Sequence, residues 1–161
     1  MSSAGEFIKL LRHPVTFRLF LLRKLPAAFF SGVRIRAMDE NHCVVTVPYK
    51  WLTQNPFRST YFASLSMAAE MSTGALAMAH LYKRRPAVSM LVLKVDSQYV
   101  KKAIGRTTFT CNDGVALKAA IDKAAAGSEP QSFTARSTGI NKEGETVAEF
   151  LITWSFKARS K

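Results

Sequence analysis

The sequence predicts an α+β fold in which a curved antiparallel β-sheet wraps around one long central helix, with a helical extension at the N-terminus. Residues 60–79 are rich in Ala, Met and Leu and apolar on nearly every side, and Glu70 is their only charged residue. This pattern is typical of a helix that is enclosed by protein. Segments with the two-residue alternation of β-strands precede and follow it. Because such a helix must be covered on more than one side, a strongly curved sheet is the economical solution.

The N-terminal residues 1–30 are expected to form helices, and residues 31–161 the core of a single domain spanning 1–161. Residues 6–24 are basic and apolar with one acid, Glu6. Proline is tolerated in the first turn of a helix, so Pro14 predicts a break followed by a second helix. A transit peptide or a membrane-surface helix remains open for this segment. A cleaved signal peptide does not fit, because basic residues interrupt the apolar run.

The remaining elements follow from periodicity and turn residues. They are strands over residues 33–38 and 43–47, a strand over 88–100, a strand over 105–112, a helix over 115–126, and a final hairpin over 132–140 and 146–157. Residues 88–95 are apolar on both faces, which predicts a central strand. In the last strand Phe150, Ile152, Trp154 and Phe156 share one face. Two strands, one enclosed helix and four further strands correspond to the hot-dog architecture.

Composition narrows the classes of function. The chain is 48% hydrophobic and 21% charged, which is ordinary for a globular protein. Its net charge of +12 favours nucleic acid, an anionic membrane or a phosphorylated ligand such as coenzyme A. The basic residues are dispersed and no nucleic-acid-binding motif accompanies them, so no specific nucleic-acid partner is expected. The central helix is not expected to span a membrane, because a carboxylate at mid-membrane is costly.

Few side chains other than Glu70 carry a chemical signature. Cys43 and Cys111 form no Cys-x-x-Cys motif, are interpreted as small strand residues, and suit a reducing, cytoplasmic location. The three histidines are not spaced as metal ligands, so we expect no metal. Ser64 and Ser66 lack the Gly-x-Ser-x-Gly context of serine hydrolases.

Glu70 carries the strongest signal. An ionised glutamate inside an apolar helix is costly unless it is paired, hydrogen-bonded or reached by water. Either Glu70 meets an arginine or a backbone donor from a neighbouring element, or it is held in a pocket as a general base or nucleophile.

The residues around Glu70 resemble a known motif. Asn55, Arg58, the segment Tyr61-Phe62-Ala63 and Glu70 have the spacing of Asn-x-x-Gly-x-x-His-Gly-Gly-x-x-x-x-(Leu/Ala)-Ala-Asp. That motif marks hot-dog acyl-CoA thioesterases of the phenylacetyl-CoA thioesterase type, and a Val-Ser pair follows it downstream, as Val88-Ser89 does here. The chain is most similar to relatives of that family known only as an uncharacterised domain.

The resemblance implies an acyl-CoA thioesterase. Glu70 would activate water or attack the thioester, Asn55 would hold the thioester, and Ser89 would orient the water. The backbone N–H groups of Phe62 and Ala63 would bind the oxyanion at the start of the helix. Further substrate contacts would be Met67 and Met71 along the acyl chain, Tyr61, and Arg58, Lys101, Lys102 and Arg106 at the rim, near the coenzyme A phosphates.

The resemblance also implies a homodimer or a dimer of dimers, and no cofactor apart from coenzyme A as part of the substrate. Arg58, Tyr61, Phe62 and Ala63 stand where the motif has Gly, His, Gly and Gly. Side chains in place of these glycines narrow the space in which the backbone N–H groups would bind the oxyanion. This favours an alternative, in which the protein is a non-catalytic hot-dog protein that binds an acyl or lipid ligand. A hot-dog dehydratase ranks lower, because its expected histidine is absent at Tyr61. The net positive charge is also compatible with peripheral contact with an anionic membrane.

Overall fold

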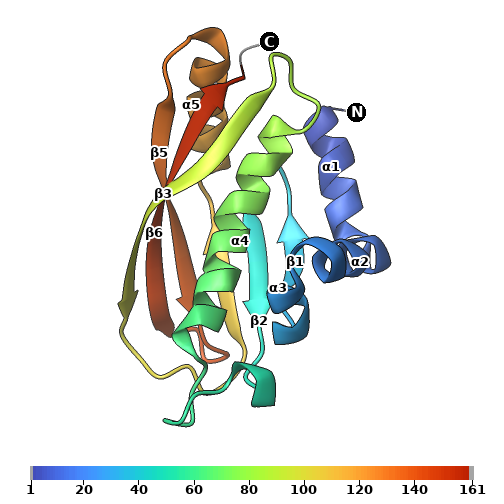
Figure 1. Cartoon of the computed structure of the whole chain (residues 1–161). Coiled ribbons are helices and arrows are strands. Elements are labelled where there is room, and N and C mark those ends of the chain that lie inside the picture. The colour runs from blue at the N-terminus through green and yellow to red at the C-terminus, as the bar shows by residue number, and fades with distance from the viewer. Residues whose placement is uncertain (1, 160–161) are drawn as a thin grey trace.

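A curved antiparallel sheet of six strands packs against one side of the helix α4 (Figure 1). The computed structural model describes residues 2–159. The strand order is β1-β2-β4-β5-β6-β3. The elements are α1 Ser3–Arg12, α2 Pro14–Lys24, α3 Pro26–Ser31, β1 Arg34–Met38, β2 Cys43–Val47, a 3-10 turn Trp51–Thr53, α4 Phe62–Leu81, β3 Val88–Tyr99, β4 Thr107–Cys111, α5 Gly114–Ala126, β5 Gln131–Ile140 and β6 Thr146–Ala158. The predicted α+β arrangement is confirmed.

The helix α4 packs its small residues against the concave face of the sheet. Ala68, Leu76 and Ala77 are fully buried, and the helix contacts β2, β4, β5 and β6. Two polar contacts fix it there. The Trp154 indole Nε1–H donates to Thr73 Oγ1 at 3.0 Å, and Ser72 and Ser137 share a hydrogen bond of 2.7 Å between their hydroxyls. None of the helices in the described part of the chain has the length and apolar character needed to cross a membrane.

The strand β6 confirms the predicted alternation. Its residues Phe150, Ile152, Trp154 and Phe156 are buried on one face of the sheet. Residues between them, such as Leu151, point to the other face of the sheet and are more exposed.

The prediction that β3 is a central strand was wrong. β3 lies at the edge of the sheet and pairs only with β6. Leu91, Leu93 and Val95 are 65%, 57% and 49% exposed. A strand that is apolar on both faces is suited to burial on both faces. The pattern does not show whether the residues that bury it come from the same chain. The free edge of β3 is therefore an apolar surface without a partner in the described chain.

Three helices precede the sheet and lie along the flank of α4 and β1 (Figure 1). The break at Pro14 is confirmed, and His13 caps α2 by accepting a hydrogen bond from the Thr16 N–H at 3.3 Å. The helix α3 falls almost wholly within residues 1–30, which were expected to be helical, but its separation from α2 at Pro26 was not predicted. It begins at Pro26 and ends at Gly32, whose φ of 78° lies in the left-handed region that glycine adopts without strain.

Candidate functional site

Glu70 lies in the middle of α4 with its side chain half-buried. Among the hydrogen bonds and ion pairs of residues 2–159, none involves its carboxyl group, whereas the neighbouring Ser72 and Thr73 hydroxyls are both bonded. Burial raises the pKa of Glu70 above its ordinary value, because the charged form loses hydration. The structural interpretation, in which an arginine or a backbone donor compensates the charge, therefore finds no such partner within the described chain.

An apolar cavity of about 70 Å³ separates Glu70 from the N-terminal helices. Its walls come from α1, α2 and the turn after α2 on one side and from α4 on the other. The lining residues are Phe7, Leu11, Phe17, Phe20, Leu21, Leu25, Glu70, Met71, Gly74, Ala75 and Met78. Glu70 is the one charged residue among them. A carboxyl group that is desolvated and unpaired has the properties of a proton acceptor poised for chemistry.

Gly74 makes room for the Glu70 carboxyl group. It lies one turn after Glu70 on the same face of α4. A Cβ atom at position 74 would stand 2.9 Å from Glu70 Oε1 and 3.1 Å from Trp154 Cζ2. The absence of a side chain at Gly74 therefore lets the carboxyl group lie next to the indole ring.

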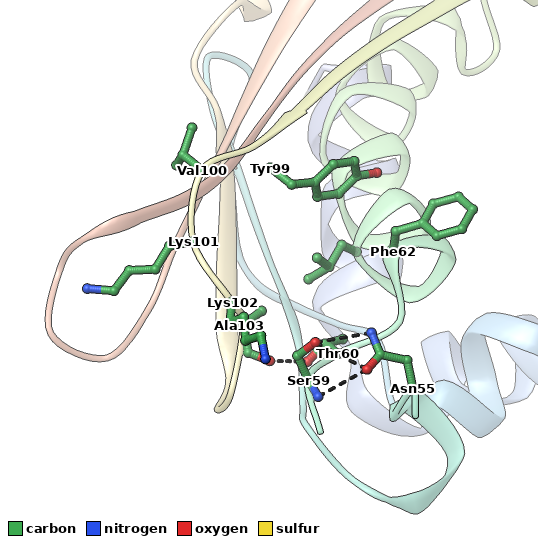
Figure 2. Close-up of a pocket in the computed structure, with 10 residues that line it drawn as sticks. Asn55, Ser59, Thr60, Phe62, Tyr99, Val100, Lys101, Lys102 and Ala103 are labelled. Carbon is green, nitrogen blue, oxygen red and sulfur yellow. Dashed lines mark hydrogen bonds between the residues drawn. The ribbon is translucent and has the colours of Figure 1, made fainter. Parts of the chain in front are cut away.

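A second, more open cavity of about 370 Å³ lies at the start of α4 (Figure 2). It is lined by Asn55, Ser59, Thr60, Phe62, Leu65, Tyr99, Val100, Lys101, Lys102 and Ala103. Thr60 joins its two walls, because both its backbone N–H and its hydroxyl donate to the Ala103 carbonyl, at 2.8 and 3.0 Å. The loop before α4 and the segment after β3 are thus held together at this cavity.

Asn55 organises the loop before α4. Its Oδ1 accepts from the backbone N–H groups of Phe57 and Ser59 at 3.0 and 3.2 Å, and its Nδ2 donates to Ser59 Oγ at 3.1 Å. Because an amide nitrogen carries two hydrogens, one donor of Asn55 is left for a ligand. Arg58 has a φ of 58°, the left-handed conformation that favours glycine. Arg58 therefore occupies the position at which the motif has glycine, and the loop keeps its left-handed bend there although the residue is arginine.

The first turn of α4 offers backbone donors. Tyr61 is the N-cap residue, and its side chain makes no capping hydrogen bond. N–H groups in the first turn of a helix lack partners within the helix, and the positive end of the helix dipole adds to their attraction for an anion. The Phe62 ring lies 4.9 Å from that of Tyr61 and 6.3 Å from that of Tyr99, between their centroids. Figure 2 shows Phe62 and Tyr99 side by side at the cavity.

The four basic residues predicted to meet the coenzyme A phosphates do not lie together around the second cavity. Lys102 lines the second cavity, and its Nζ lies 3.4 Å from the Phe57 carbonyl oxygen. The Lys101 ammonium points away from the cavity in Figure 2 and pairs with Glu145 at 2.6 Å. Arg58 and Arg106 are exposed and do not line this cavity.

Ser89 lies away from α4 in the described chain. It pairs with Lys157, while its neighbour Met90 pairs with the buried Phe156. Since successive residues of a strand point to opposite faces, Ser89 lies on the outer face, where its hydroxyl donates to the Lys157 carbonyl at 3.1 Å. A role for Ser89 beside Glu70 stays a prediction of the resemblance alone.

The predicted residues thus gather in two places along α4. Glu70 and Met71 line the apolar cavity, and Asn55, Phe62, Lys101 and Lys102 line the second cavity. Seven or eight residues separate Glu70 from Ala63 and Phe62, which is roughly 10–12 Å along the helix axis. Within one chain, the carboxyl group and these backbone donors are therefore too far apart to act on one thioester carbonyl.

One face of α4 between the two cavities is left partly open. Ala63, Ser66, Met67 and Glu70 are half-buried, and they follow the spacing i, i+3, i+4, i+7 of a single helical face. The residues beside them in the helix, such as Leu65, Ala68 and Ala69, are buried. This face and the free edge of β3 are surfaces that the described chain leaves uncovered.

Sequence reasoning missed several residues around Glu70. Gly74 was detectable, because it lies four residues after Glu70 on the same helical face. Phe17, Phe20 and Leu21 were not, because no local pattern shows that α2 packs over the middle of α4. Cys43 and Cys111 are confirmed as buried strand residues paired across β2 and β4. Burial raises the pKa of each thiol to about 12, so neither is a ready nucleophile.

Comparisons with solved structures support the fold. A Pseudomonas aeruginosa protein of unknown function, termed a probable thioesterase, matches with a TM-score of 0.76 and 17% identity, over 91% of this chain and 97% of that chain. A thioesterase mutant from the same organism matches with a TM-score of 0.66 and 17% identity, over 92% and 97%. A Haemophilus influenzae thioesterase matches with a TM-score of 0.63 and 16% identity, over 87% and 88%. At these identities, the likeness shows the fold.

Among curated protein sequences, none matches this chain. The model of a family described as a domain of unknown function, DUF4442, matches residues 15–156. That range includes Glu70, the second cavity, the lining of the apolar cavity except Phe7 and Leu11, and the sheet up to residue 156 of β6. The expected resemblance to hot-dog thioesterases and their uncharacterised relatives is confirmed. The chain therefore has the hot-dog fold and belongs to the DUF4442 family.

Proposed function

We propose that the protein hydrolyses acyl thioesters of coenzyme A, with Glu70 as the general base or the nucleophile. The observation that carries this proposal is the Glu70 carboxyl group, half-buried beside an apolar cavity without a bonded partner in the described chain. The thioesterases with the same fold support the same class of reaction. Free buried cysteines agree with a reducing compartment, and we propose the cytoplasm.

The chemistry requires a carboxylate, water and donors for an oxyanion. Acting as a base, Glu70 takes a proton from water while the hydroxide attacks the carbonyl carbon of the thioester. The oxyanion accepts hydrogen bonds from backbone N–H groups until the carbon–sulfur bond breaks. The proton on Glu70 then passes to the departing thiolate, giving a carboxylic acid and free coenzyme A. No cofactor enters these steps, since coenzyme A is part of the substrate.

We further propose that a homodimer completes the site. Pairing two copies of β3 edge to edge would satisfy its free backbone groups and cover the apolar side chains there. A two-fold axis beside β3 would also bring the open faces of two α4 helices together in opposite directions. The first turn of one helix, with Phe62 and Ala63, would then lie near Glu70 of the other. This arrangement removes the separation between acid and backbone donors within one chain.

The second cavity is suited to the polar part of the substrate. It is open, it contains both polar and apolar side chains, and Lys102 lies on its wall. The apolar cavity beside Glu70 is suited to the acyl group, with Met71 and Met78 as adaptable walls. In the proposed dimer, the substrate would thus place its thioester between the apolar cavity of one subunit and the second cavity of the other.

The test is a hydrolysis assay with acyl-CoA thioesters of graded chain length, combined with native mass spectrometry of the purified protein. Thioester hydrolysis well above the uncatalysed rate is expected for at least part of the series. If a bound lipid is found and no acyl-CoA is hydrolysed, the protein is a non-catalytic acyl-binding protein and the proposal is wrong.

Lys102→Ala is expected to raise KM for acyl-CoA by about 3- to 10-fold with little change in kcat, the effect of one partly exposed charge contact. An acyl thioester of N-acetylcysteamine, which lacks the phosphates, should show no such change. Lys142→Ala, in the turn between β5 and β6, is the matched control. An equal effect on both substrates would show that Lys102 does not meet the phosphates.

Gly74→Ala is expected to reduce kcat by at least about tenfold while the protein stays folded. The added methyl group would meet Glu70 Oε1 and the Trp154 ring, and the flexible carboxylate would move more readily than the buried indole. Alanine also gains about 1 kcal/mol of helix propensity over glycine, which offsets part of the packing cost. Gly105→Ala is the control, since a Cβ there meets no atom within 4 Å. Unchanged kcat in Gly74→Ala would show that the carboxyl position is unimportant.

A further inference from the structure

The helix α2 is apolar on two opposite faces. Phe17 and Leu21 are buried against the rest of the domain. Val15, Leu19 and Leu22 lie on the other side, within roughly 60° of one another at 100° per residue, and are 60%, 55% and 42% exposed. A surface helix normally carries polar residues on its outer side. We call Val15, Leu19 and Leu22 the outer stripe of α2.

The segment that carries the outer stripe is strongly basic. Residues 7–38 contain no aspartate or glutamate. Their basic residues are Lys9, Arg12, Arg18, Arg23, Lys24, Arg34 and Arg36. All except Arg18 are exposed, and none takes part in an ion pair of the described residues. Arg23 and Lys24 directly follow Leu22 at the end of α2, so unpaired positive charge borders the outer stripe.

An exposed apolar stripe with a basic border fits one class of partner best. Nucleic acid would use the cations but leave the aliphatic side chains in water. A second copy of the same face would bring like charges together. An anionic bilayer satisfies both features, because apolar side chains enter the boundary between headgroups and acyl chains while Arg and Lys meet lipid phosphates.

We propose that the outer stripe of α2, together with Arg23 and Lys24, docks this protein on the surface of anionic lipid bilayers. Docking requires neither a spanning segment nor the proposed activity of Glu70. The inner face of the same helix, through Phe17, Phe20 and Leu21, forms a wall of the cavity beside Glu70. In a docked protein, only α2 would therefore separate that cavity from the bilayer. Acyl chains that partition into the lipid would lie close to the cavity.

The test is flotation of the full chain with vesicles of phosphatidylcholine alone or containing about 30% phosphatidylglycerol, which supplies negative surface charge. Binding to the anionic vesicles is expected to be at least about tenfold stronger and to weaken with salt. Leu19→Glu combined with Leu22→Glu, and separately Arg23→Glu combined with Lys24→Glu, should each reduce this binding at least about tenfold.

Val115→Glu is the control for an added charge, because Val115 is an aliphatic residue that is even more exposed, at 72%, and belongs to α5, on the other side of the molecule (Figure 1). It should bind as the unaltered protein does. Leu19→Ser combined with Leu22→Ser gives the same test without added charge, with the fold checked by circular dichroism.

Two results would overturn the proposal. If both Leu19/Leu22 variants bind anionic vesicles normally, the attraction is purely electrostatic and the outer stripe does not insert. If these variants instead change the mass of the protein by light scattering without lipid, the outer stripe is an interface between copies.

Discussion

Replacing Glu70 by Gln is expected to abolish hydrolysis of acyl thioesters and, in the same protein, to raise the melting temperature at neutral pH. Glutamine cannot accept the proton from water or attack the carbonyl, so kcat should fall by at least about 100-fold. It also removes a desolvated charge that has no bonded partner in the described chain. Because the glutamine amide is also polar, only the cost of the charge is relieved, on the order of 1 kcal/mol, which corresponds to about 2–4 °C for a chain of this size.

The stability gain has a defined dependence on pH. Burial raises the pKa of Glu70 in the folded protein above its value in the unfolded chain. The folded state then binds the proton more tightly, so this group favours folding at low pH, and its contribution is lost as pH rises through the folded pKa. The difference in melting temperature between Glu70→Gln and the unaltered protein should therefore be largest at neutral pH. It should shrink as pH falls and level off below the pKa of an ordinary glutamate, which is about 4.3.

Thermal unfolding between pH 4 and pH 8, with kcat on the same samples, measures both effects. Glu143→Gln is the control, because Glu143 is exposed in the turn between β5 and β6 and should change neither quantity. A lower melting temperature for Glu70→Gln would show that Glu70 holds the fold through a favourable contact. Full activity with higher stability would show that Glu70 is neither the general base nor the nucleophile.

Leu93→Asp combined with Val95→Asp is expected to convert the proposed dimer into monomers and to remove hydrolysis. In a two-fold interface each substitution enters twice, so four carboxylates would face one another where apolar side chains meet. Burying or opposing these charges should weaken the dimer at least about 100-fold, the equivalent of about 3 kcal/mol. Both side chains are exposed on β3, so the subunit itself should remain folded.

Multi-angle light scattering and the hydrolysis assay, run over the same range of protein concentrations, check this prediction. Asp substitution of Val115 on α5 is the control for an added charge at an exposed aliphatic residue. Active monomers would show that one chain contains the whole site. An inactive variant that remains dimeric would show that β3 is not the dimer contact.

Local patterns in the sequence determined most of the elements. The two-residue period of β6 and the apolar composition of α4 reflect neighbours within the same element, and both predictions were confirmed. Residues 1–30 were expected to be helical, but Pro26 and Gly32, which mark the two ends of α3, were not recognised as the limits of a separate third helix. Such patterns could not predict that β3 lies at the edge of the sheet. Apolar residues on both faces of a strand do not show which chain packs against them.

The anomaly of Glu70 was determined by the sequence alone, since a single acid in an apolar helix is costly wherever that helix packs. Only the tertiary structure decided its surroundings. The cavity beneath α2, the space above Gly74 and the indole of Trp154 come from segments far apart in the sequence, brought together by packing. Local periodicity indicates which face of an element is buried, but the partner on that face depends on long-range contacts. For this reason the sequence identified the acid, and the structure defined the cavity in which it lies.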